Sequence, residues 1–320
     1  MESQPVNLIF QGGGVLGIMY AGAIQQMGIM GKLDKIQRVS GTSAGAIAAT
    51  VLALGCNSED AMKIIKAIPF KKMMDDNFGM VRDLLRLVTK YGISKGEFFL
   101  DWLGDLIRDQ GLSPDITFQE LRDAKVGPDL YVTATNLTYQ KHQIFSWETS
   151  PDIPVRNAVR MSMSVPYFFK AVRHNGDYMV DGGLIYNLPI DLFDNIKYCN
   201  DSTLASSSQT YESDLHDTDP NYFFNNETLG FKINRTDKKQ QSIKKKPRLI
   251  KNIFDYSAAI TDLLYQTSSL HNLNPEDTKR LIPVSSLGVE SLDFKVSEQE
   301  IEMLAEEGKN AVIQFFKKQD

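Results

Sequence analysis

One serine in the sequence has the surroundings of a nucleophile. Ser43 lies within Gly41-Thr42-Ser43-Ala44-Gly45, a spacing in which Gly41 and Gly45 permit a sharp turn that exposes the serine hydroxyl. The apolar residues 36–40 predict a strand before it, and the Ala-rich residues 44–54 predict a helix after it. A helix start at this point favours negative charge that develops on a carbonyl oxygen. In this context the pattern is typical of a nucleophile elbow, whereas the five letters alone are more often the start of a small-residue helix.

A second glycine-rich motif follows an apolar run at residues 6–10 that predicts a strand. It reads Gly12-Gly13-Gly14-Val15-Leu16-Gly17, and the candidates for an oxyanion hole made of backbone N–H groups are Gly12, Gly13, Gly14 and Gly17. The same spacing satisfies the dinucleotide fingerprint, and Asp34 lies where a ribose-binding acid is expected. A nucleotide-binding oxidoreductase of the Rossmann type is therefore an open alternative. The elbow at Ser43 favours the hydrolase, since a Rossmann protein needs no elbow after its second strand.

A serine hydroxyl is a poor nucleophile until a neighbouring base takes its proton. The usual base is histidine, but the surroundings of the four histidines mark none as catalytic, and His174 is the least implausible among His142, His174, His216 and His271. Asp181 ends a short predicted strand at residues 178–180, and Gly182 and Gly183 would let its carboxylate approach another backbone segment closely. Taken alone, Asp-Gly-Gly is usually just a turn.

The three motifs, in this order, resemble those of the patatin-like phospholipase family. Supporting similarity lies at residues 158–169 and 228–231, and the resemblance covers residues 6–198 well and the rest loosely. It implies a Ser–Asp dyad in which Ser43 attacks an ester carbonyl and becomes acylated while Asp181 accepts its proton. It also implies that N–H groups around Gly13 and Gly14 stabilise the oxyanion. Catalysis would be independent of calcium and would need no metal or other cofactor.

Two features test this resemblance physically. A carboxylate is a weak base with a reference pKa of about 4, and a dry, apolar cleft would have to raise the pKa of Asp181. The fifth position of the glycine motif is often Arg or Lys in the family, and here it is Leu16. Backbone donors do not depend on that side chain, so the predicted oxyanion hole is kept.

The order of predicted elements indicates how these motifs are positioned. Strand, helix, strand and helix follow one another with short connections, which predicts an α/β protein: a three-layer α/β/α patatin-like fold with a central, mainly parallel or mixed sheet. Residues 6–198 are the expected catalytic core, residues 199–227 a polar surface loop, and residues 228–320 a C-terminal strand and helical extension packed on the same domain. Further elements are predicted as helices at 15–30, 155–161, 253–270 and 297–316 and as strands at 130–136, 143–147, 228–233 and 280–284.

Composition limits the partners. The 320 residues are 42% apolar and 23% charged with a net charge of -5, which is ordinary for a globular protein and argues against a general nucleic-acid binder. Two cysteines, Cys56 and Cys199, fit a reducing compartment. The sequence predicts no signal peptide and no transmembrane segment. The cytoplasm is the expected location, with peripheral membrane contact and export without a cleavable signal left as alternatives.

The expected substrates are fatty-acyl esters of phospholipids or lysophospholipids, and a non-catalytic lipid-binding module is a second alternative. Residues 69–74 and 80–88 mix bulky apolar side chains with Lys and Arg, which is typical of a lid or interfacial element and equally of an ordinary packed helix. A basic run at residues 238–251 can attract anionic lipid, although solvation is the favoured interpretation.

Overall fold

The computed structural model describes residues 4–73, 92–199, 220–234, 250, 253–271 and 273–318. The predicted lid segment at 80–88, the cations of the basic run, His216 and most of the predicted loop at 199–227 lie outside these residues.

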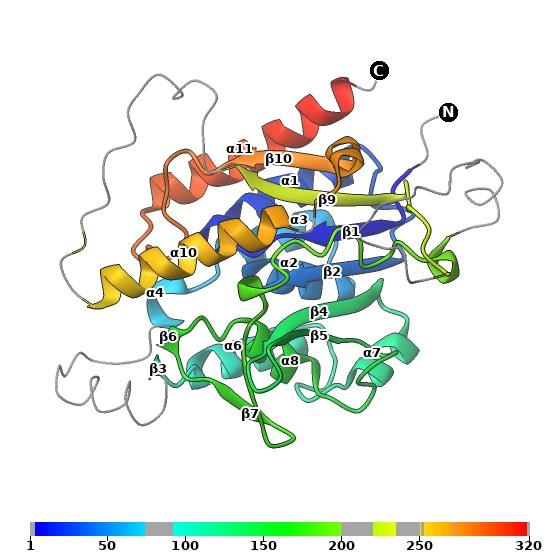
Figure 1. Ribbon diagram of the computed structural model, residues 1–320. Coiled ribbons are helices and arrows are strands. Elements are labelled where there is room, and N and C mark those ends of the chain that lie inside the picture. Colours follow the sequence, from blue (N-terminus) through cyan, green and yellow to red (C-terminus); the bar gives the residue numbers. More distant parts are fainter. Residues whose placement is uncertain are drawn as a thin grey trace.

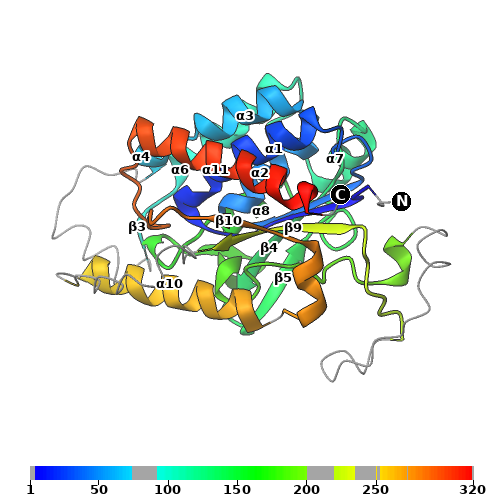
Figure 2. The ribbon, with the colours of Figure 1, turned by 90° about the horizontal axis from the view of Figure 1, so that it is seen from above.

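A central sheet lies between two layers of helices, as Figure 1 and Figure 2 show. Its strands are β1 (Asn7–Phe10), β2 (Arg38–Thr42), β4 (Asp129–Asn136), β5 (Lys141–Phe145), β7 (Val172–His174), β8 (Asp177–Asp181), β9 (Thr228–Asn234) and β10 (Leu281–Ser285). The helices are α1 (Met19–Ile29), α2 (Ala44–Ala53), α3 (Ser58–Lys66), α4 (Phe70–Met73), α6 (Glu97–Asp109), α7 (Phe118–Ala124), α8 (Val155–Ser162), α10 (Ile253–His271) and α11 (Glu298–Lys317). Helices α1, α2, α3 and α11 cover one face of the sheet, and α10 lies on the other (Figure 2).

The sheet is mixed. The strand order is β10-β9-β1-β2-β4-β8-β7, with β5 also paired to β4. The five strands from β10 to β4 are parallel, whereas β8, β7 and β5 are antiparallel to their neighbours. A separate two-stranded sheet joins β3 (Gly92–Ser94) to β6 (Tyr167–Phe169). The three-layer α/β prediction with a mainly parallel or mixed sheet is confirmed.

The C-terminal region contributes to the central sheet as well as to the helical layers. Strand β9 pairs with β1, with Leu8 opposite Leu229, and β10 pairs in turn with β9. Because Leu8, Phe10 and Phe231 are all fully buried, these strands form part of the main core. The first strand of the chain therefore has an early neighbour, β2, on one side and a late neighbour, β9, on the other.

Two glycines allow α1 and α11 to cross closely. A methyl group added at Gly22 would lie 1.8 Å from the carbonyl oxygen of Ala305, and one at Gly308 would lie 1.9 Å from that of Met19. The helix predicted at residues 15–30 differs at its start, because a 3₁₀ turn, η1 (Gly14–Ile18), precedes α1. Gly14 has a positive φ of 56°, and the following N–H of Val15 donates to Ser291 O at 2.9 Å, which ties the turn to the C-terminal region.

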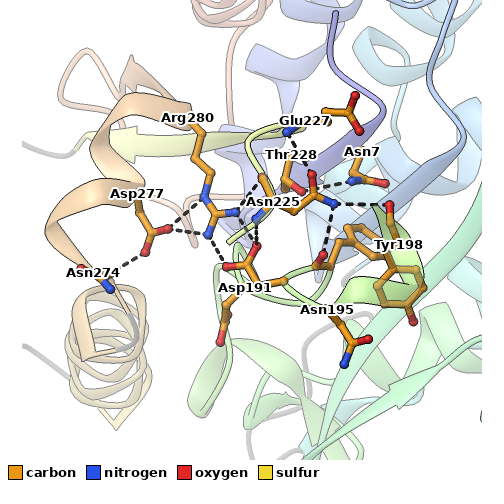
Figure 3. A network of polar contacts seen from close by, with 12 residues as sticks. Asn7, Asp191, Asn195, Tyr198, Asn225, Glu227, Thr228, Asn274, Asp277 and Arg280 are labelled. Carbon is orange, nitrogen blue, oxygen red and sulfur yellow. Dashed lines mark hydrogen bonds and ion pairs between the residues drawn. The ribbon is translucent and has the colours of Figure 1, made fainter. Parts of the chain in front are cut away.

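A buried polar cluster fastens the edge of the sheet next to β9 and β10 (Figure 3). Arg280, 4% exposed at the end of η5 (Pro275–Arg280), holds both carboxylate oxygens of Asp194 at 2.6 Å. Its Nε donates to Asp277 at 2.9 Å, and its Nη1 donates to Asn225 O at 3.1 Å. One guanidinium thus joins three segments that are far apart in sequence. The short turn η3 (Ile196–Tyr198) lies beside them.

Candidate active site

Ser43 stands where β2 ends and α2 begins. Its φ of 53° and ψ of -124° are unusual for a residue with a side chain, and strain of this kind concentrates at functional turns. A methyl group at Gly41 would lie 2.1 Å from Gly45 O, and one at Gly45 would lie 2.2 Å from Phe10 O. Both glycines are therefore required for the close approach of strand and helix that forms the turn.

Two neighbours of Ser43 come from the end of α8. The Ser43 N–H donates to Ser162 Oγ at 2.8 Å, and the Ser43 hydroxyl lies 3.5 Å from Met163 Sδ, a weak acceptor. Ser43 itself is 1% exposed. Ser162 and Met163 belong to the segment whose similarity to the family the sequence showed, but nothing in their residue types indicated contact with the serine.

Asp181 is the last residue of β8 and is fully buried. Its N–H donates to Ser164 O at 3.0 Å, and its Oδ1 accepts the Gly183 N–H at 2.8 Å. The second oxygen, Oδ2, is buried and, among the described residues, receives no hydrogen bond within the usual limits of distance and angle. Burying an acceptor without a hydrogen bond costs free energy. Oδ2 is therefore expected to accept a hydrogen bond when a donor is correctly placed.

The electrostatics of Asp181 are set by its burial. Loss of solvation raises the pKa of its carboxyl to about 7, and interactions with Ser43, the Gly183 N–H and Tyr265 oppose the rise. Ser43 and Tyr265 therefore lie close enough to the carboxylate to stabilise its charge, although neither donates to Oδ2 at ideal geometry. Catalytic hydrogen bonds are often long before substrate binds.

The glycine motif lies against the serine. A methyl group at Gly12 would lie 3.3 Å from Ser43 Cβ. The Gly12 N–H donates to Asn187 O at 3.1 Å, whereas the N–H groups of Gly13 and Gly14 have no acceptor within the described residues. Gly17 packs on the start of α2, where a methyl group would lie 2.7 Å from Ala44 Cβ. Of the four predicted glycines, Gly13 and Gly14 thus keep donors available.

Sequence reasoning missed the residues that join these motifs. Asn187 Nδ2 donates to Gly12 O at 3.2 Å and to Ser269 Oγ of α10 at 2.9 Å, and Gln11 Nε2 donates to the same Ser269 Oγ at 2.7 Å. Ser268 Oγ donates to Gly183 O at 2.6 Å. Asn187 follows Asp181 by six residues, but an amide there carries no chemical signal, and the serines lie in a helix with only an amphipathic pattern.

The ring contacts described for two histidines are with other aromatic side chains and not with Ser43 or Asp181. The His142 ring lies 4.8 Å from that of Tyr186, and the His174 ring lies 5.6 Å from that of Phe145. The side chain of His271 lies outside the described residues. Within the described ranges, no three or more His, Cys, Asp or Glu side chains are grouped so that they could hold a metal ion.

An apolar cavity of about 550 Å³ adjoins the Asp181 turn. Val180 and Leu184 line it on either side of Asp181 and its glycines, and α10 forms one wall. The full lining is Leu137, Pro166, Tyr167, Ala171, Tyr178, Val180, Leu184, Ile260, Thr261 and Leu264. Tyr167 and Leu264 at its rim are 42% and 43% exposed. Of the two segments predicted as a lid or interfacial element, the described residues 69–73 do not line this cavity, and residues 80–88 lie outside the described part of the chain.

The molecule is a three-layer α/β protein with a mixed central sheet and a serine at the turn between a strand and a helix. Residues 8–194 match the family described as Patatin-like phospholipase. The chain therefore belongs to the patatin-like phospholipase family, as the ordered motifs predicted.

Related proteins are found in bacteria and viruses. The chain is 34% identical over 197 residues to "Uncharacterized protein YqhO" of Bacillus subtilis, a match that covers 59% of this chain and 66% of that protein, just under two thirds of its length. It is 28% identical over 224 residues to "Probable lipid hydrolase 463L" of Invertebrate iridescent virus 6, which covers 66% of this chain and 73% of that one. Among solved structures, VipD from Legionella pneumophila aligns with a TM-score of 0.62 at 19% identity, over 99% of this chain and 67% of that chain. This last likeness shows the fold.

Proposed function

We propose that the protein is a serine acyl hydrolase that cleaves fatty-acyl esters of phospholipids or lysophospholipids, with Ser43 as nucleophile and Asp181 as base. The observation that carries the proposal is the fully buried Asp181 carboxyl, whose Oδ2 lacks a hydrogen bond of good geometry and whose pKa is raised to about 7 while Ser43 stabilises its charge. A base poised near neutral pH suits proton abstraction from a hydroxyl.

The steps follow from these positions. The Ser43 hydroxyl, now beside the weak acceptor Met163 Sδ, turns to Asp181 and gives up its proton as Oγ bonds to the ester carbonyl carbon. The N–H groups of Gly13 and Gly14, together with the N-terminus of α2, stabilise the oxyanion. The leaving alcohol takes the proton from Asp181 as the C–O bond breaks. Asp181 then deprotonates a water molecule that attacks the acyl-Ser43 carbonyl, and the proton returns to Ser43.

The apolar cavity supports a long acyl chain as the acid part of the substrate. Val180 and Leu184 of its lining flank Asp181 in the sequence, and the lining is apolar apart from the hydroxyls of Thr261 and two tyrosines. The exposed apolar side chains at its rim support peripheral contact with a lipid surface. No helix in the described ranges has the length and apolarity to cross a bilayer.

The test compares wild type with Ser43→Ala and Asp181→Asn on phospholipid, lysophospholipid and triglyceride, with labelling by a fluorophosphonate as a second readout. We expect both variants to fold and to lose nearly all turnover, and labelling to be lost in Ser43→Ala. Turnover that persists in Asp181→Asn would remove the dyad. Wild type that binds lipid without turnover would favour the lipid-binding module, and binding of NAD without labelling would favour the oxidoreductase.

A further inference from the structure

Helix α10 brings a tyrosine to the candidate base. Tyr265 is 1% exposed, although its helix forms an outer layer of the molecule (Figure 2). A methyl group added at Gly183 would lie 2.8 Å from Tyr265 Cε1 and 3.0 Å from Asp181 Oδ1. Since Cε1 is bonded to the ring carbon that carries the hydroxyl, the polar end of the ring and the carboxylate both face the space beside Gly183.

Hydrogen bonds to the Tyr265 carbonyl and from the neighbouring Ser268 hold this part of α10 in place. Its carbonyl oxygen accepts Asn187 Nδ2 at 3.4 Å and Ser269 Oγ at 2.5 Å. Ser268, three residues further along the helix, donates its hydroxyl to Gly183 O. Ser268 therefore bonds the helix to the Asp-Gly-Gly turn three residues beyond Tyr265.

We propose that Tyr265 is a positioning residue of the catalytic site, whose hydroxyl donates to Asp181 Oδ2 and holds the carboxylate toward Ser43. This inference rests on the proposed function, because it concerns the base of that reaction. Oδ1 is already held by the Gly183 N–H. A second donor on Oδ2 fixes the plane of the carboxylate and leaves its remaining lone pair for the Ser43 proton.

The phenol also adjusts the charge of the base. Burial favours the neutral carboxyl, whereas a hydrogen bond to the carboxylate favours the ionised form. Tyr265 is among the groups that lower the pKa of Asp181 against the effect of burial. Tyr265 moves no proton itself. Its effect is to increase the fraction of Asp181 that is ionised, and therefore able to accept the Ser43 proton, at neutral pH.

The decisive variant is Tyr265→Phe, which keeps the ring and removes the hydroxyl. The measurement is kcat/KM for a water-soluble acyl ester between about pH 5 and pH 10. We expect the midpoint of the acidic limb of this pH profile to shift to higher pH by about one unit, in line with loss of one donor to a carboxylate. Activity at pH 7 should fall several-fold, while the alkaline plateau stays within about threefold of wild type. A purely structural role would lower activity equally at every pH.

Tyr186→Phe is the matched control, because this buried tyrosine donates to Asp191 at 2.6 Å, and its profile should keep the wild-type midpoint. If Tyr265→Phe folds poorly, 3-fluorotyrosine at position 265 keeps the shape and strengthens the donor, so the midpoint should move downward. An unmoved midpoint in both variants, or an equal shift in Tyr186→Phe, would overturn the inference. Turnover retained by Ser43→Ala or Asp181→Asn would instead reject the proposed function.

Discussion

At the scale of single residues, burial gives Asp181 a chemistry that an exposed aspartate lacks. The same loss of solvation that raises its pKa to about 7 disfavours its ionised form in the folded protein. Ser43 carries a second cost, because its positive φ is held by the surrounding close contacts. Burial of the Asp181 carboxyl and backbone strain at Ser43 thus both reduce the stability of the fold. Such costs are frequent where chemistry requires a fixed geometry.

The raised pKa of Asp181 predicts a pH dependence of activity. In the proposed mechanism the ionised carboxylate is the base, so kcat/KM should rise about tenfold per pH unit below pH 7 and level off above it. The profile should be measured with a soluble ester that does not ionise in this range. A profile that stays flat from pH 5 to pH 8 would contradict the assignment of Asp181 as base.

The same shift predicts a stability effect of Asp181→Asn. Since the folded pKa lies above the unfolded one, the contribution of the Asp181 carboxyl to stability is fully present below about pH 4 and is lost as pH rises through 7, by up to about 4 kcal/mol. The amide cannot ionise, so the variant should unfold at higher urea concentration than wild type at pH 8, and the difference should vanish near pH 4. Asp152→Asn, at an exposed position, is the control and should show no such difference.

At the scale of elements, the sequence predicted those parts of the site whose residue pattern is confined to a short stretch of chain. Apolar runs next to glycines located β1, β2 and α2, and the motif around Ser43 fixed the turn between the last two. The roles of Asn187, Tyr265 and Ser269 had no such pattern, because their contacts join segments that are 78 to 258 residues apart in the sequence. Burial of Asp181, on which its pKa depends, is also a product of the whole fold.

The wall that α10 contributes to the cavity predicts a change in acyl-chain preference. Leu264→Trp should fill the cavity and reduce kcat/KM for a decanoyl ester at least about tenfold, since apolar discrimination of this kind is worth about 1–3 kcal/mol. Butyryl-ester turnover should change less than about threefold. Leu263→Trp is the matched control, because Leu263 is 63% exposed and lies outside the cavity lining. Equal effects of the two variants would argue against the cavity as the acyl site.

The Arg280 cluster predicts a large loss of stability without a change in chemistry. Arg280→Ala leaves Asp194 and Asp277 buried without their cation, which should lower the free energy of unfolding by about 3–5 kcal/mol. Urea unfolding measures this loss. Lys279→Ala should change the same quantity by less than about 0.5 kcal/mol, because the Lys279 side chain is 71% exposed. A loss below about 1 kcal/mol for Arg280→Ala would show that the cluster is dispensable.

At the scale of the whole molecule, early and late parts of the chain are interleaved. Strand β1 lies between β2 and β9, and α1 lies against α11. The glycine motif is tied to residues after position 230 by Gln11, which accepts the Ile233 N–H at 2.7 Å. The region before residue 199 therefore contains Ser43 and Asp181 but lacks several of the groups that enclose them.

The crossing of α1 and α11 predicts a size limit at Gly308. Gly308→Val would place a side chain against the Met19 carbonyl, so the helices must separate, at a cost of about 1–3 kcal/mol. Thermal unfolding should show a clear fall in Tm. Gln314→Val makes a similar change at an exposed position of the same helix and should have a small effect. Equal Tm values for the two variants would contradict the close crossing.

The late position of α10 has a consequence for protein synthesis. A ribosome translating this chain completes Ser43 and Asp181 well before it reaches Tyr265 and the serines that clamp the Asp-Gly-Gly turn. A nascent chain stalled near residue 230 would contain Ser43 and Asp181 without the helix that encloses them. Under the proposed function, ester cleavage is therefore expected to begin only after α10 has emerged from the exit tunnel.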